Sequence, residues 1–331
     1  MVECRRTQSQ SKEENMEYLR EADFEALFSM GDFLEACHQA YQLYGQGVII
    51  NPPREEVVEQ REGLDYFGLN MPAEWPGKYR SCKVIEELSD VAEGRLAKRE
   101  AYIEFEDLQK GELWRLDAGF ITDMRTGAAG ALGIKYLAGT GVKRVAVLGT
   151  GRVSRCLAQA CDALFELDEM RCTSRRPENR EQFAAEVGPE LETPLQMVES
   201  IEACVEGVEV VLTAVPTPEP ILTAAHLDGV SYVAVIAGDG RTRQVASEVL
   251  EGRGVVVDVL EQAQKSGEMR FAGAAGRLAQ IQLARGEDGA VLTIGDAACG
   301  RVGDAASVVY LTGMGALDLC AAAMISRRSI A

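Results

Sequence analysis

Hydrophobic positions change their spacing along the chain. In the first third the apolar runs are short, such as 48–50, 82–85 and 101–105, and Pro, Gly and charged residues separate them. This spacing predicts strands and turns in a mixed or antiparallel sheet. Further on, apolar strands alternate with helical patterns, which predicts a parallel, doubly wound sheet of the Rossmann type. The fold class is therefore α/β, with a second α+β domain.

The elements of this later part follow from their periodicity. Alanine-rich and amphipathic stretches predict helices, and short Val-rich runs predict strands. The predicted helices are 123–138, 151–165, 177–187, 195–204 and 313–327, and the predicted strands are 143–149, 169–174, 208–214, 231–237 and 254–258.

Composition narrows the possible partners. The 331 residues carry a net charge of −18, which argues against binding to nucleic acid or to an anionic membrane surface, because both need a basic face. The most apolar long run, 305–325, contains Asp318, so we expect a buried helix and not a membrane span. The nine cysteines form no CxxC pair and predict a reduced, cytoplasmic protein. With His38 and His226 as the only histidines, we expect no metal site.

A glycine turn gives the clearest chemical signal. Residues 145–159, VAVLGTGRVSRCLAQ, read as a buried strand, a turn and a helix start. Gly149 permits the tight turn, Gly151 lets a phosphate approach the backbone, and Ser154 is small enough for helix–strand packing. The free N–H groups of the helix would bind a pyrophosphate. The alternative is a glycine turn without a ligand.

The residues after the second strand bear on the choice of dinucleotide. An NAD site would place Asp or Glu near position 174, where this chain has Ser174, followed by Arg175 and Arg176. An arginine there can pair with a 2′-phosphate, so NADP is favoured, with NAD possible. The alternative is that both arginines are simply solvated.

Three residues are candidates for the site where the substrate reacts. Lys83 lies within an apolar run, Arg125 lies near the start of a helix, and Asp239 directly follows a predicted strand. Ligands bind at the carboxyl ends of parallel strands, where Asp239 would lie. Asp239 can equally be a turn-forming residue before Gly240.

Five segments occur in the order typical of one family. They are ITDMRTGAAGALGIKYLA (121–138), VAVLGTG (145–151), RCTSRRPENREQFA (171–184), VVVDVLEQA (255–263) and LTGMGALDLCAAA (311–323). In these motifs the chain resembles the ornithine cyclodeaminase/mu-crystallin family from about residue 24 onwards. The resemblance implies NAD(P) dependence and a homodimer. It also implies a substrate-binding and dimerisation domain of residues 1–122 with 308–331, and a dinucleotide-binding domain of residues 123–307.

The resemblance also implies roles for single residues. Arg54 in NPPREE, Lys83 in SCKVI and Arg125 in DMRTG match substrate-binding residues, and Lys83 and Asp239 match the positions that transfer protons. For the cofactor, the resemblance adds Arg152, Val153 and Thr213, together with Arg243 and Thr312, which match a Lys and a Ser of the family. The predicted cofactor-binding positions are therefore Gly149, Thr150, Gly151, Arg152, Val153, Ser174, Arg175, Arg176, Thr213, Arg243 and Thr312.

Three activities agree with this resemblance. The first is an imine reductase or amino-acid dehydrogenase acting on the C–N bond of a small amino or imino acid. The second is an ornithine cyclodeaminase, which uses the cofactor without net redox change. The third is a nucleotide-binding protein without turnover. Because the chain lacks the Pro-x-Asn segment that cyclodeaminases usually carry after the lysine, we expect a substrate other than ornithine.

Overall fold

The computed structural model describes residues 16–61, 64–90, 95–238, 240, 242–303 and 306–329. The chain divides into two compact units. The first runs to Arg125 and resumes at Met314, and the second is Thr126–Gly313. Both divisions lie a little later in the chain than the predicted ends at 122 and 307. A division at 307 would cut through strand β13, which pairs with two strands of the second unit.

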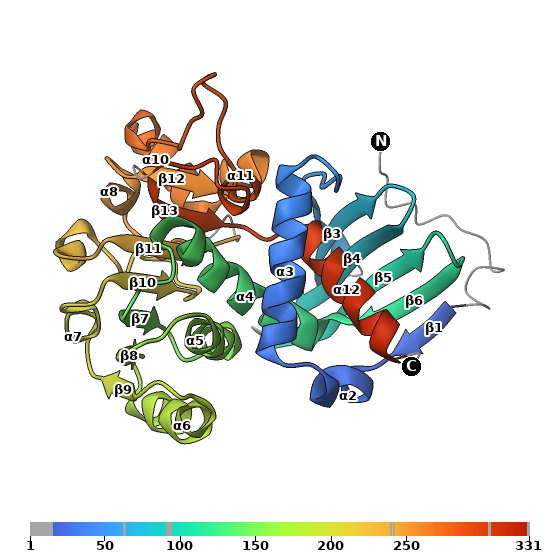
Figure 1. Cartoon of the computed structure of the whole chain (residues 1–331), viewed down its shortest axis with the longest axis horizontal. Coiled ribbons are helices and arrows are strands. Elements are labelled where there is room, and N and C mark those ends of the chain that lie inside the picture. Colours follow the sequence, from blue (N-terminus) through green and yellow to red (C-terminus); the bar gives the residue numbers. More distant parts are fainter. Residues whose placement is uncertain are drawn as a thin grey trace. The chain divides into compact units, whose positions relative to one another are not determined.

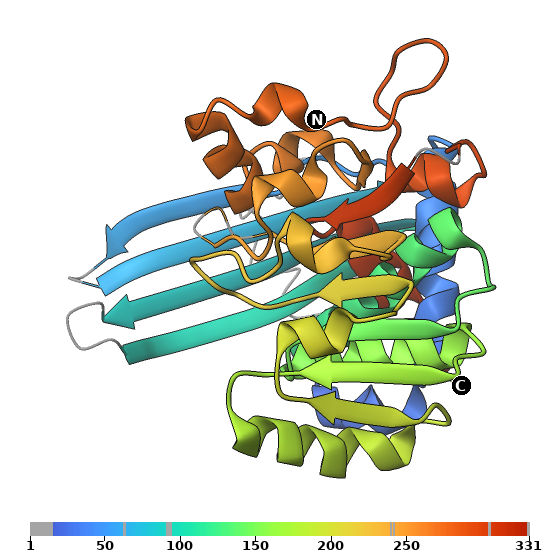
Figure 2. The same cartoon turned by 90° about the vertical axis from the view of Figure 1, so that its left-hand side faces the viewer.

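The first unit is built on a six-stranded sheet with the order β1-β6-β5-β4-β3-β2. All neighbouring strands are antiparallel except β1 and β6. Figure 2 shows the long strands β2 to β5 side by side. The strands are β1 (Met16–Leu19), β2 (Glu55–Arg61), β3 (Leu64–Trp75), β4 (Tyr79–Asp90), β5 (Arg95–Asp107) and β6 (Glu112–Asp117).

One helix covers a face of this sheet, and a second helix packs against the first. Helix α12 packs on β3, β4 and β5 and runs alongside α3, as Figure 1 shows. The cross-strand row Met71, Lys83, Ile103 and Leu116 is buried and points to α12. The helices of the first unit are α2 (Glu21–Phe24), η1 (Glu25–Leu27), α3 (Met30–Gly45), the start of α4 (Ala118–Ala138) and α12 (Gly315–Ser329).

The second unit is a seven-stranded, wholly parallel sheet with the order β12-β13-β11-β10-β7-β8-β9. The order reverses between β7 and β10, so the predicted doubly wound sheet is confirmed. Its strands are β7 (Arg144–Leu148), β8 (Glu169–Thr173), β9 (Leu195–Val198), β10 (Val210–Thr213), β11 (Tyr232–Ile236), β12 (Gly254–Val257) and β13 (Ala306–Leu311).

Short helices and loops join these strands. The predicted helix 195–204 is wrong in its first half, because residues 195–198 pair with β8 as an edge strand before a shorter helix begins. The helices are α5 (Arg152–Leu164), α6 (Pro177–Val187), η2 (Gly188–Glu190), α7 (Ile201–Val205), η3 (Ala224–Leu227), α8 (Ser247–Leu250), α9 (Leu260–Ala263), α10 (Gly267–Ala274), η4 (Leu278–Gln280) and α11 (Ile294–Ala298).

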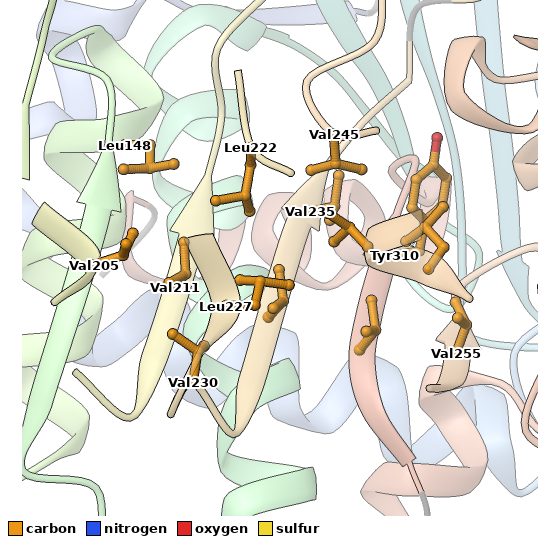
Figure 3. Packing of buried hydrophobic residues seen from close by; sticks show 14 of the residues in the cluster. Leu148, Val205, Val211, Leu222, Leu227, Val230, Val235, Val245, Val255 and Tyr310 are labelled. Carbon is orange, nitrogen blue, oxygen red and sulfur yellow. The ribbon is translucent and has the colours of Figure 1, made fainter. Parts of the chain in front are cut away.

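Both faces of the parallel sheet are buried, which explains its nearly continuous Val-rich strands. On one face, alternate strand residues pack against residues from the connecting segments, as Figure 3 shows for Val211 and Val235 with Leu222, Leu227 and Val245. This core holds the strand ends in register and so fixes the loops that follow them.

The glycines of helix α4 permit close packing on the other face. A Cβ atom on Gly127 would lie 2.4 Å from the backbone carbon of Cys156, and one on Gly130 would lie 2.4 Å from a methyl group of Leu157. A Cβ atom on Gly133 would lie 3.0 Å from Val309. The glycines of the RTGAAGALG motif are therefore explained by the backbone approach of α4 to α5 and β13.

This packing makes Gly127→Ala a test of the fold. We expect it to lower the free energy of unfolding by about 1–3 kcal/mol, because the methyl group overlaps backbone that cannot move away easily. The matched control is Gly273→Ala in helix α10, where a Cβ atom meets nothing within 4 Å. Urea denaturation of both variants would measure this, and an equal effect would contradict the packing.

Candidate functional site

A buried cluster of charged side chains joins three elements of the first unit. Lys83 comes from β4, Arg125 from α4 and Asp318 from α12, and their side chains are 1%, 7% and 0% exposed. Lys83 Nζ lies 3.0 Å from Asp318 Oδ2, and Arg125 Nε donates to Asp318 Oδ1 at 3.2 Å. Oδ2 of Asp318 is the nearer oxygen to Lys83, but only Oδ1, at 3.4 Å, has the angles of a hydrogen bond with Nζ. One carboxylate thus pairs with two buried cations.

Arg54 contributes a third positive charge near this cluster. It lies just before β2, its side chain is 12% exposed, and its guanidinium forms an ion pair with Glu56 at 2.7 Å. Its charge is near enough to lower the pKa of Lys83. The structure therefore brings together the three residues that the sequence predicted as substrate-binding.

Burial and neighbouring charges change the protonation of Lys83. Burial above all, and then the charge of Arg125, lower its pKa from 10.5 to about 8, although Asp318 acts in the opposite direction through its charge and a hydrogen bond. Lys83 can therefore exchange a proton close to neutral pH, which an ordinary lysine cannot.

Sequence reasoning did not assign Asp318 to the site. It used this residue only to argue against a membrane span in run 305–325. The signal was present, because a lone carboxylate in an apolar helix needs a buried partner. The run also contains a strand, β13, before its helix.

In the second unit, the glycine turn follows β7 at the point where the strand order reverses. Gly149 has a φ of +106°, and its N–H donates to the carbonyl of Thr173 at the end of β8. A Cβ atom on Gly149 would lie 2.9 Å from Ser154 Oγ and 2.9 Å from Val215. The first glycine and the small third residue of the motif therefore depend on each other.

The start of helix α5 has the features of an anion site. No side chain caps it at Gly151, and its first turn contains no acidic residue. A Cβ atom on Gly151 would meet nothing within 4 Å, so the backbone is open to a ligand. Ser154 Oγ is buried and has no hydrogen-bond partner among the described residues. These observations fit a bound phosphate group, which N–H groups at a helix start bind well.

The other predicted residues around this turn are accessible. Arg152, Arg175 and Arg176 are exposed, and Val153 and Ser174 are half-buried. The Ser174 carbonyl accepts a hydrogen bond from Arg180 at 2.7 Å, which holds the loop after β8. Because Gly149 hydrogen-bonds to the end of β8, this loop lies beside the glycine turn.

Two predicted cofactor residues are instead held by other side chains. Thr213 is buried, and its hydroxyl donates to Gln244 Oε1 at 2.9 Å. Gln244 also accepts from the backbone of Val215 and donates to the carbonyl of Ile236. Arg243 pairs with Glu219 at 2.7 Å and stacks on Phe271. These contacts join the loops that follow β10 and β11.

Thr312, at the end of β13, is fixed by a buried carboxylate. Its hydroxyl and N–H donate to Asp258 at 2.7 and 2.6 Å, and Gly313 N–H donates at 2.6 Å. Burial raises the pKa of Asp258, while these hydrogen bonds act against the rise. Nearby, Tyr310 donates to Glu268 at 2.6 Å, and Glu268 accepts from the backbone of Gln244. Side chains thus cross-link the carboxyl ends of β10 to β13.

Asp239, the predicted proton-transfer residue, lies outside the described residues. The described part of the chain holds no group of three or more His, Cys, Asp or Glu residues that could bind a metal ion. Within the same residues, no helix is long and apolar enough to cross a membrane.

A parallel sheet with this turn at its switch point is typical of nucleotide-binding domains. The model of the ornithine cyclodeaminase/mu-crystallin family matches residues 13–330. The chain belongs to this family.

The names of similar proteins point to different substrates. An alanine dehydrogenase of Archaeoglobus fulgidus is 26% identical over 77% of each chain. An iminosuccinate reductase of Paracoccus denitrificans is 30% identical over 61% of this chain and 62% of its own.

Solved structures establish the same fold. The Thermococcus litoralis Δ1-pyrroline-2-carboxylate reductase, in complex with NADH and L-proline, has a TM-score of 0.81 and 21% identity over 95% of this chain and 98% of its own. An archaeal alanine dehydrogenase dimer with bound NAD has a TM-score of 0.79 and 24% identity over 95% and 96%.

Substitution of the two glycines of the turn should change the stability of the protein by different amounts. We expect Gly149→Ala to lower the free energy of unfolding by about 1–3 kcal/mol, because alanine is strained at this positive φ and meets Ser154. We expect Gly151→Ala to change it by less than about 0.5 kcal/mol, because the added methyl group points into open space. Thermal or urea unfolding would measure both, and equal losses would refute the described turn.

Proposed function

We propose that the protein is an NAD(P)H-dependent oxidoreductase that acts on the C–N bond of a small amino or imino acid. The observation that carries the proposal is the buried cluster of Lys83, Arg125 and Asp318, which offers a carboxylate-binding fork and a proton donor in one place. The names of the relatives, an alanine dehydrogenase, an iminosuccinate reductase and a pyrroline-2-carboxylate reductase, describe reactions of this class.

The cofactor is assigned to the second unit. The pyrophosphate would bind the N–H groups at the start of α5, where the Ser154 hydroxyl has no hydrogen-bond partner within the part of the chain that the structure describes. Arg175 and Arg176 are exposed and could pair with a 2′-phosphate, so we favour NADP(H), while NAD(H) stays possible. When bound, the nicotinamide supplies a hydride to the imine carbon or accepts one from the amino acid. The full proposed set is Gly149, Thr150, Gly151, Arg152, Val153, Ser174, Arg175, Arg176, Thr213, Arg243 and Thr312.

The substrate is assigned to the first unit. Arg125, with Arg54, would hold the carboxylate, because guanidinium groups bind carboxylates by two parallel hydrogen bonds. Lys83 would donate a proton to the nitrogen of the imine, since its lowered pKa permits transfer near neutral pH. Asp239 is proposed as a second proton-transfer residue.

We also propose a homodimer in the cytoplasm, with the first unit making the dimer contact. The alanine dehydrogenase named above is a dimer. Strand β2 lies at the edge of its sheet, and its residues Val57 and Val58 are 43% and 77% exposed. Exposed apolar edge strands readily pair with another chain. No disulfide bond joins the cysteines that the structure describes, which agrees with a reducing compartment.

Turnover with defined substrates tests the proposal. Pyruvate, glyoxylate or oxaloacetate with ammonia or methylamine, and preformed cyclic imino acids, would each be mixed with NADPH or NADH, and absorbance of the reduced cofactor followed. We expect oxidation of the cofactor with at least one pair. Ammonia release from ornithine at constant absorbance would indicate a cyclodeaminase instead. Nucleotide binding without any turnover would indicate a binding protein.

Arg125→Lys tests the carboxylate fork. We expect the substrate KM to rise about 10–100-fold, because lysine keeps the charge and loses a charge-assisted hydrogen bond of about 1.5–3 kcal/mol. The affinity for reduced cofactor should not change. Arg99→Lys on β5, an exposed residue paired with Glu87, is the control and should leave KM unchanged. An unaltered KM in Arg125→Lys would remove this residue from the site.

The pKa of Lys83 predicts how activity depends on pH. Lys83 is protonated below about pH 8, so kcat/KM for imine reduction should be level there. Above that pH it should fall about tenfold per pH unit, because the proton donor is lost. For the reverse reaction, which needs Lys83 as the uncharged amine, kcat/KM should rise over the same pH interval. A constant kcat/KM in both directions up to about pH 10, near the ordinary lysine pKa, would contradict this role.

A further inference from the structure

Asp318 has no assigned role in the reaction, yet burying its carboxylate costs free energy. It is fully buried in α12, where the neighbouring turns carry Ala316 and residues 321–323, all alanine. Buried ion pairs seldom add net stability over apolar residues of similar volume, so packing alone does not explain a carboxylate here.

Other contacts already anchor α12. Asn51 accepts a hydrogen bond from the N–H of Ala316 at 2.8 Å, and Gly315 lies so close to β3 that a Cβ atom would meet the carbonyl of Pro72 at 2.6 Å. At the other end, Arg327 donates to the hydroxyl of Tyr79, and Arg328 donates to Asp32. The helix would therefore dock in the same place without Asp318.

The geometry shows what Asp318 does to its two partners. It accepts from Nε of Arg125, so both terminal amino groups of that guanidinium lie outside this contact. These two groups form the end of the fork that binds a carboxylate. The same carboxylate stands 3.0 Å from Nζ of Lys83.

From these contacts we propose that Asp318 is a positioning residue for the reaction: it turns the Arg125 fork towards the substrate carboxylate and keeps Lys83 charged. This inference rests on the proposed function. Asp318 acts through Lys83 and Arg125, and it is not itself a proton donor to the substrate.

The charges around Lys83 agree with this role. Burial and the charges of Arg125 and Arg54 all act to remove its proton, and Asp318 acts to retain it. The thiol of Cys37 on α3 also faces this region, where it donates to the carbonyl of Arg125, and the thiol of Cys320 on α12 lies near Cys37. Burial raises the pKa of both thiols, so they are neutral at working pH and cannot replace the carboxylate.

Asp318→Asn tests the proposal because it keeps the shape of the side chain and removes its charge. We expect the alkaline fall of kcat/KM to move about 1–3 pH units lower, which is the usual effect of losing an opposite charge at this distance. The substrate KM should rise, and cofactor affinity should not change. The matched control is Glu87→Gln on the same strand as Lys83, which removes a half-buried carboxylate paired with Arg99 and should change neither the pH profile nor the substrate KM.

A direct measurement separates this inference from the proposed function. In protein labelled with [13Cε]lysine, the Lys83 signal, assigned with Lys83→Arg, should titrate near pH 8 in the unaltered protein and lower in Asp318→Asn. This readout needs no turnover. An unchanged Lys83 titration would overturn the inference, whereas absent turnover with a shifted titration would overturn only the proposed reaction.

If Asp318→Asn does not fold, Asp318→Glu supplies the second test. It keeps the charge and displaces the oxygens by one methylene group, so the alkaline limb should stay near its usual pH while the substrate KM rises. A folded Asp318→Glu protein with unchanged KM would show that the carboxylate is only structural, and would overturn the inference.

Discussion

A buried positive charge needs a buried partner, and the first unit of this protein is arranged around that constraint. Lys83 and Arg125 are nearly inaccessible, and the ionised forms of such groups are strongly disfavoured unless they are paired. Their shared partner, Asp318, follows Lys83 by 235 positions. The last helix, which Asn51, Tyr79 and Asp32 also anchor, brings this carboxylate back to the first sheet after the chain has built the second unit.

The second unit depends on a different constraint. The loops that follow its parallel strands lie at the surface, so contacts other than burial must fix them. Here buried polar side chains hold them. Gln244 joins the ends of β10 and β11, Glu268 joins Gln244 to β13, and Asp258 fixes Thr312. Each of these side chains has partners with good geometry, which makes such a network rigid. The glycine turn lies on this side of the sheet, so it is presented by a fixed frame.

Sequence patterns predicted the parts of this structure that depend on local rules. The parallel sheet and the glycine turn after β7 follow from periodicity and from the steric needs of a tight turn. The strand at 195–198 was missed because a short amphipathic run does not distinguish strand from helix without its neighbour. Asp318 was missed as a neighbour of Lys83 and Arg125 for another reason. These partners precede it by 235 and 193 positions, and no spacing rule connects them.

The charge of the proposed site accounts for how an acidic protein would bind an anionic substrate. The net charge of −18 would repel a carboxylate, but salt screens such repulsion beyond about 8 Å. At the cluster, the cations Lys83, Arg125 and Arg54 outnumber the carboxylates Asp318 and Glu56 by one, and Glu56 is 44% exposed and thus partly hydrated. In the function proposed above, this excess of one positive charge over the named carboxylates would suit one substrate carboxylate, so local charge would select the substrate against the field of the whole molecule.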